Sequence, residues 1–89
     1  MAYQLVTASV DLTTKGKALL SWHFEETAGA VARIALRNGS ASGDVVVPIR
    51  LAASDSKGGA YGAAPGFIFP NGVYVEVVTG TVRGSVDII

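Results

Sequence analysis

The chain has 89 residues, seven acidic and seven basic, with a formal net charge of zero and no cysteine. This length corresponds to one small domain, and the lack of cysteine excludes both a disulfide scaffold and thiolate chemistry. Only 16% of residues are charged, against about 25% in ordinary soluble domains, so we expect a protein that associates with its own copies or with a partner.

The first part of the chain predicts three strands separated by turns. Residues 5–10 form a short first strand, and residues 18–25 a second in which Leu20, Trp22 and Phe24 share one face. This alternation is typical of a half-buried strand. A third strand covers residues 30–37; its composition also suits a helix, but the strict alternation favours a strand.

The middle of the chain contains one clear strand and one irregular segment. Val45 to Leu51 is apolar at alternate positions, and Pro48 lacks an N–H group, which predicts a sheet edge or a bulge. Residues 52–66 are rich in glycine and predict a long loop, with at most a short strand at Ala60-Tyr61.

The last part of the chain is almost continuous strand material. Phe67 to Phe69 is extended, and Asn71-Gly72 predicts a tight turn. Residues 73–78 and 81–88 are expected to form a final hairpin around Thr79-Gly80. Gly84 marks a place where a neighbouring strand approaches closely.

These elements add up to seven or eight short strands and no helix. We therefore expect an all-β protein, a compact antiparallel β-sandwich or jelly-roll-like domain, with residues 1–89 as a single domain. The expected core consists of Leu20, Trp22, Phe24, Ile34, Leu36, Val47, Ile49, Val75, Val77, Val82 and Val86.

No constellation of residues points to catalysis. His23 is the only histidine, and of the two acidic residues that follow it only Glu25 shares its face of the strand. The carboxylates are scattered rather than spaced as in a calcium loop, and the glycines lack a phosphate-loop pattern. We expect no enzymatic activity, no metal site and no cofactor.

The arginines are better explained by protein contacts than by nucleic acid. Arg33 and Arg37 share a face of their strand, and Arg50 is expected beside them. Because the net charge is zero, the basic footprint of direct nucleic-acid binding is missing. The arginines are expected to form salt bridges across strands or to a partner. No apolar run approaches the roughly 20 residues that span a bilayer, so no membrane contact is expected.

The segment 54–66 is expected to face a partner. It contains Tyr61 and Pro65 but few charges, and long loops in compact domains are usually functional or disordered. We therefore predict partner contacts at Tyr61, Pro65, Arg33 and Arg37.

Residues 21–89 resemble small virion proteins of tailed bacteriophages. The likeness lies in Arg37-Asn38-Gly39-Ser40, in the strand from Val45 to Leu51, in the segment Pro65 to Phe69, and in the run from Asn71 to Val86. The resemblance implies a non-enzymatic β-sandwich, most simply a capsid decoration (cement) protein that is made in the host cytoplasm and binds the assembled head. Its partners would be its own copies, with a homotrimer favoured, and the major capsid protein or another virion protein.

Two alternatives stay open. One is a tail, collar or fibre component. The other is a carbohydrate-binding module that stacks sugars on Trp22, Tyr61 and Tyr74. Trp22 separates the two classes, since it should be buried in a structural protein and exposed beside another aromatic side chain in a sugar-binding one.

Overall fold

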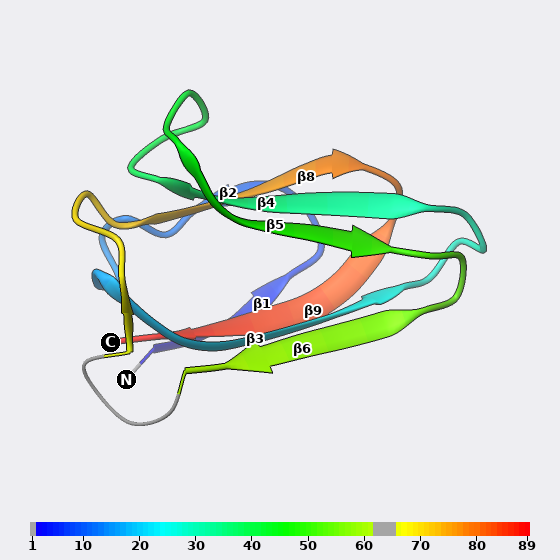
Figure 1. Cartoon of the computed structure of the whole chain (residues 1–89), viewed down its shortest axis with the longest axis horizontal. Helices are drawn as coiled ribbons and strands as arrows, with labels where there is room; N and C mark the ends of the chain where they lie inside the picture. The colour runs from blue at the N-terminus through cyan, green and yellow to red at the C-terminus, as the bar shows by residue number, and fades with distance from the viewer. Residues whose placement is uncertain (1, 62–65) are drawn as a thin grey trace.

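The computed structural model describes residues 2–61 and 66–89, which form two antiparallel sheets packed face to face (Figure 1). The five-stranded sheet runs in the order β1 (Ala2–Val6), β9 (Val82–Ile88), β3 (Ala18–Glu26) and β6 (Ser56–Ala60), and β7 (Phe67–Ile68) also pairs with β3. The four-stranded sheet runs in the order β2 (Val10–Asp11), β8 (Val73–Thr79), β4 (Ala32–Asn38) and β5 (Val45–Leu51). The all-β sandwich predicted from the sequence is confirmed.

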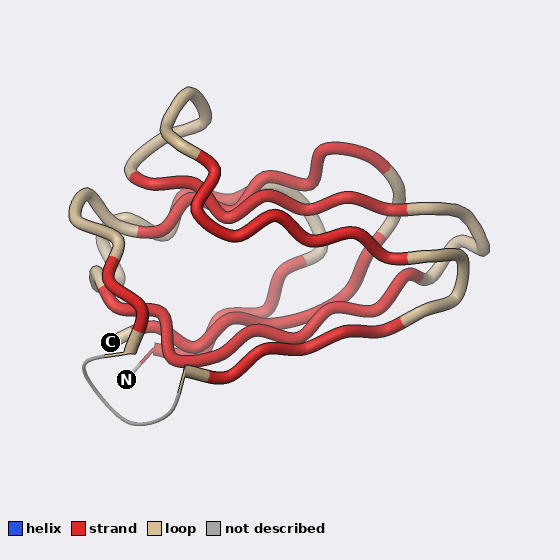
Figure 2. Tube along the Cα trace, viewed as in Figure 1, coloured by secondary structure: helices blue, strands red, loops and turns tan. Residues whose placement is uncertain are grey.

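Most strand boundaries agree with the sequence-based expectation, as the strands drawn in red in Figure 2 show. The strand Val45–Leu51 matches residue for residue and lies at a sheet edge, as Pro48 predicts. The expected strand at residues 5–10 is instead two strands in different sheets, β1 and β2. The expected long loop contains β6, which is missed because Ser-Lys-Gly-Gly-Ala has low β-propensity. Within the described residues there is no helix that could cross a membrane.

The final hairpin predicted around Thr79-Gly80 is wrong. Strands β8 and β9 belong to different sheets, so this turn carries the chain from one sheet to the other. Gly80 has φ +86°, and a Cβ atom there would lie 2.7 Å from the Cβ of Ala32. The turn therefore needs glycine both for its backbone conformation and for space. A hairpin turn also favours glycine, so the sequence alone does not distinguish a hairpin from a crossing between sheets.

The core lies between the two sheets. Seven of the predicted core residues are buried: Phe24, Ile34, Leu36, Ile49, Val75, Val82 and Val86. Trp22, Val47 and Val77 are partly buried and pack against this core, whereas the prediction is wrong for Leu20, which is partly buried outside it. In β3 the reason is a register shift between Leu19 and Ser21, which places Leu19 in the core and Leu20 outside it.

Close packing between β3 and β9 depends on Gly84. This glycine lies opposite Phe24, and a Cβ atom there would overlap the carbonyl oxygen of His23 and lie 2.6 Å from the Phe24 ring. The ring of Phe24 is fully buried, so the missing side chain at Gly84 makes room for the largest core residue of this sheet. The close approach predicted from the sequence is confirmed.

The three connections that link β3 to β4, β5 to β6 and β8 to β9 all cross between the sheets at one end of the sandwich, on the right of Figure 1. They are joined by hydrogen bonds. The backbone N–H of Glu26 donates to the carbonyl of Asp55 (2.8 Å), and that of Thr27 donates to the carbonyl of Thr81 (3.1 Å). We call this end of the molecule the crossover end.

The carboxylate of Glu26 holds the crossover end together. It is buried, with 5% of its surface exposed, and it accepts hydrogen bonds from the backbone N–H groups of Ala28 (2.6 Å), Gly29 (2.7 Å) and Ser54 (2.8 Å). Hydrogen bonding by Ser54, followed by that of the β3–β4 connection, lowers the pKa of Glu26 below its ordinary 4.5 against the opposing effect of burial.

Replacing Glu26 with Gln should destabilise the protein at neutral pH, because an amide group would point an N–H donor at backbone N–H groups. A carboxyl group with a lowered pKa in the folded state stabilises fully above the unfolded-state value of about 4.5, and this contribution disappears as pH falls through the folded-state value. The stability difference between wild type and Glu26→Gln, measured by urea unfolding, should therefore shrink in acid.

The neighbouring variant Glu25→Gln is the matched control. Glu25 pairs with Arg83 at the surface, and exposed ion pairs contribute about 1 kcal/mol or less. If Glu26→Gln and Glu25→Gln unfold at the same urea concentration at neutral pH, Glu26 does not have the role assigned to it.

Candidate functional site

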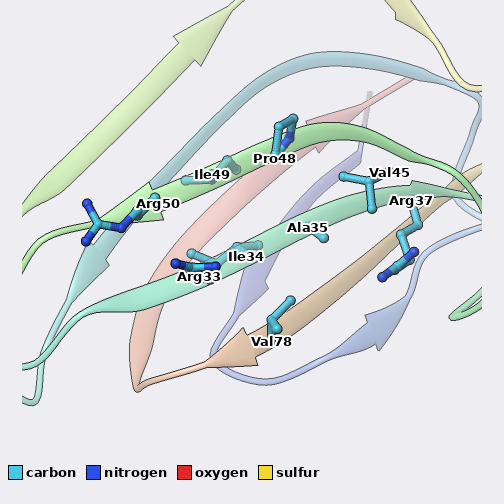
Figure 3. A pocket seen from close by; sticks show the side chains of 9 residues that line it. All are labelled: Arg33, Ile34, Ala35, Arg37, Val45, Pro48, Ile49, Arg50 and Val78. Carbon is cyan, nitrogen blue, oxygen red and sulfur yellow. The ribbon is translucent and has the colours of Figure 1, made fainter.

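The outer face of the four-stranded sheet carries an open depression of about 420 Å³. Its floor is apolar and comes from Ala35 of β4, Pro48 of β5 and Val78 of β8 (Figure 3). Val45 lies at one end of the depression, and Val45 and Val78 are 44% and 50% exposed. We call this feature the arginine depression, because three arginines line it.

Arg33 and Arg50 lie at the same end of the arginine depression, and Arg37 lies at the other end (Figure 3). Arg33 and Arg50 are direct cross-strand partners in the β4–β5 register, so their Cβ atoms are roughly 5 Å apart. Both side chains are exposed. The sequence-based expectation that Arg50 neighbours the other two arginines is confirmed for Arg33 and is wrong for Arg37, which lies opposite Val45.

The carboxylates on this face have hydrogen-bond partners other than Arg33 and Arg50. Glu76 accepts from Arg37 at 3.0 Å, and Arg37 also donates to the carbonyl of Gly43 at 2.8 Å. Asp11 accepts from the backbone and hydroxyl of Thr13, which lowers its pKa. Among the described residues, no carboxylate lies within ion-pair distance of Arg33 or Arg50. Two adjacent guanidinium groups are thus left facing solvent.

Tyr61 lies on the other sheet, beside β6, and is partly buried against the core. Its backbone N–H donates to the carbonyl of Leu20 (2.8 Å), and its hydroxyl accepts from the indole N–H of Trp22 (3.2 Å). Its ring meets Phe67 edge-on, with centroids 5.2 Å apart. Tyr61 is thus built into the fold, and its predicted partner contact stays a prediction. Pro65 lies outside the described residues.

The outer face of the five-stranded sheet carries exposed apolar side chains, and its charged residues Glu25 and Arg83 pair with each other. Leu5 is 75% exposed and lies opposite Ser85, which lies opposite His23. Ile68 is 50% exposed and lies opposite Ala18. Directly opposed residues in a sheet share a face. The register shift between Leu19 and Ser21 puts Ala18 on the same face as His23 although they are five positions apart, so Leu5 and Ile68 extend from one outer surface. We call it the neutral face.

The neutral face also carries His23 and Glu25, the two residues that the sequence analysis considered for catalysis. His23 is exposed, and Glu25, its only same-face carboxylate neighbour on the strand, accepts from Arg83 instead. Asp87 has one carboxylate oxygen without a hydrogen-bond partner among the described residues. No group of three metal-ligating side chains occurs in residues 2–61 and 66–89.

The aromatic residues do not form one platform. Trp22 and Tyr61 are associated with the five-stranded sheet, whereas Tyr74 lies in β8 of the other sheet. Trp22 is partly buried, and a Cβ atom at Gly59 would lie 2.7 Å from its indole nitrogen, so β6 covers part of the ring. Trp22 therefore fits neither the fully buried nor the openly exposed arrangement expected from the sequence.

The structure places Arg33 and Arg37 on one face, at opposite ends of the arginine depression, and places Tyr61 on the other sheet. The exposure of Val45, Val78 and Leu5 was not predicted from the sequence. The signal for Val78 was present, since it follows Val77 in an alternating strand and the two must face opposite ways. A scan against protein-family models and comparisons with curated proteins and solved structures return no match to this chain.

Replacing Tyr61 with Phe should destabilise the protein by about 0.5–1.5 kcal/mol, because the indole N–H of Trp22 loses its acceptor. Urea unfolding followed by the fluorescence of Trp22, the single tryptophan, measures this directly. Tyr74→Phe is the control and should change stability by no more than about 0.5 kcal/mol. Equal effects of the two variants would contradict the assigned hydrogen bond.

Proposed function

We propose that this protein is a non-enzymatic structural protein of a bacteriophage virion, with capsid decoration as its first role. The observation that carries the proposal is the neutral face, a sheet surface on which Leu5 and Ile68 are at least half exposed and the charges of Glu25 and Arg83 neutralise each other. The resemblance of residues 21–89 to phage virion sandwiches supports it. Exposed apolar side chains lose contact with water when a partner covers them, which favours association.

Assembly through repeated weak contacts suits such a protein. A small domain attached to a regular lattice needs only modest affinity per contact when several contacts form together. We favour a homotrimer, in which the neutral faces or their edges meet around a closed axis. The low charge content of the chain reduces repulsion between copies at close range.

Multi-angle light scattering should give the mass of three chains for the wild-type protein. Leu5→Asp and Ile68→Asp should each shift the mass toward that of one chain, because a charge buried in an interface without a partner opposes association. Val31→Asp is the matched control, since Val31 is also exposed (43%) but lies in the β3–β4 connection. A wild type that is monomeric at every concentration, or equal dissociation by Val31→Asp, would remove the neutral face from this role.

The virion role has its own test. Antibodies against this chain should label purified particles of the phage that encodes it, at many regularly spaced positions on the head. Labelling confined to the tail, collar or fibres would replace decoration by the alternative structural role. Particles that lack the protein altogether would overturn the proposal.

A further inference from the structure

The arginine depression is a second surface, on the opposite sheet from the neutral face, and the proposed oligomer does not use it. We propose that it binds an extended protein segment that places one carboxylate between Arg33 and Arg50 and apolar side chains along the floor. This inference rests on the proposed function only in taking the occupant to be a protein of the particle.

The carboxylate follows from the two arginines. Like charges directly opposite each other in a sheet are unfavourable, and Arg33 and Arg50 are such a pair. The acidic groups on this face are engaged with Arg37 and Thr13. A guanidinium group presents a planar fork of donors that fits a carboxylate. One acidic side chain can therefore bridge both arginines and relieve their repulsion.

The apolar part of the occupant follows from the floor. Ala35, Pro48 and Val78 offer no charged group, and Val45 and Val78 are about half exposed. At the far end, Arg37 is already neutralised by Glu76. A nucleic acid would meet only two unpaired arginines here, on a chain with zero net charge, and would lack the series of cations that phosphates need. A segment with one acid and several apolar residues fits this pattern of charges.

The occupant lies on the face of the sheet and does not extend it. Strand β5 is at the sheet edge, but Pro48 in its middle has no N–H group to offer to an added strand. Along β5, Arg50 and Val45 are five positions apart, which spans about five residues of an extended peptide. Side chains at alternate positions of that peptide would face the floor.

These dimensions define a probe. The pentapeptide acetyl-Glu-Ser-Val-Ser-Val-amide carries one carboxylate followed by two valines on the same face, and acetyl-Gln-Ser-Val-Ser-Val-amide differs only in charge. In an NMR titration of the full chain, the Glu peptide should shift the side-chain Nε–H signals of Arg33 and Arg50 and the backbone signals of Ala35 and Val78. The Gln peptide should bind roughly tenfold or more weakly, because it lacks the charge-assisted hydrogen bonds.

Variants of matched charge make the test specific. Arg33→Gln and Arg50→Gln should each weaken binding of the Glu peptide by roughly tenfold. Arg83→Gln removes the same charge from the other sheet, where Arg83 pairs with Glu25, and should leave binding unchanged. The spectra of all three variants should keep the dispersion of the wild type, which shows that the fold is intact.

Several outcomes would overturn the inference. They are the absence of a saturable shift at millimolar Glu peptide, equal binding of the two peptides, and equal weakening by Arg83→Gln. Tighter binding of inorganic phosphate or of a thymidine oligonucleotide at the same signals would replace a protein segment by a phosphate ligand. A change of oligomer mass in Arg50→Gln but not in Arg83→Gln would make a second copy of the chain the occupant.

The peptide titration tests the arginine depression and light scattering tests the assembly through the neutral face, so each proposal can fail without the other. A monomeric wild type that binds the Glu peptide retains the arginine depression and removes the assembly through the neutral face. A trimeric wild type that does not bind the Glu peptide retains the assembly and removes the arginine depression as a binding site.

Discussion

The arrangement of the two sheets depends on the buried carboxylate of Glu26. A sandwich whose chain crosses between sheets must satisfy the backbone N–H groups of its connections, because they cannot join either ladder. Glu26 accepts three of them, from Ala28, Gly29 and Ser54, and so ties the β3–β4 connection to the β5–β6 connection. The third connection joins them through the bond from Thr27 to Thr81.

This constraint reaches the outer surface. Arg33 lies near the start of β4 and Arg50 near the end of β5, so both stand close in sequence to the connections that Glu26 fixes. Their opposition across the β4–β5 ladder requires that these two strands keep their register up to the crossover end. The buried acid thus helps to position the two exposed arginines, although Glu26 lies in β3 of the other sheet. The neutral face depends instead on the packing of Phe24 over Gly84, which keeps β3 and β9 close together.

The sequence predicts the features of this protein that are local. Alternating apolar residues predict most strands. Pro48 predicts the edge position of β5 because a proline cannot donate a hydrogen bond to a neighbouring strand at its own position. Arg33 and Arg37 could be placed on one face because they lie on one strand. The features that were missed depend on distant residues. Thr79-Gly80 is compatible with a hairpin or with a crossing, and only the pairing of β9 with β1 and β3 decides between them. From the sequence, Glu26 looks like part of a polar turn. Its role could not be predicted because its partner Ser54 lies 28 residues away.

Backbone amide hydrogen exchange, followed residue by residue, tests the central claim that Glu26 holds the crossover end together. At neutral pH, the N–H groups of Ala28, Gly29 and Ser54 should exchange slowly, although they lie in connections where amides ordinarily exchange fast. In Glu26→Gln all three should become fast together, while amides in the centre of β3 and β9 stay protected. Fast exchange of the three amides in the wild type, or unchanged exchange in the variant, would contradict the account.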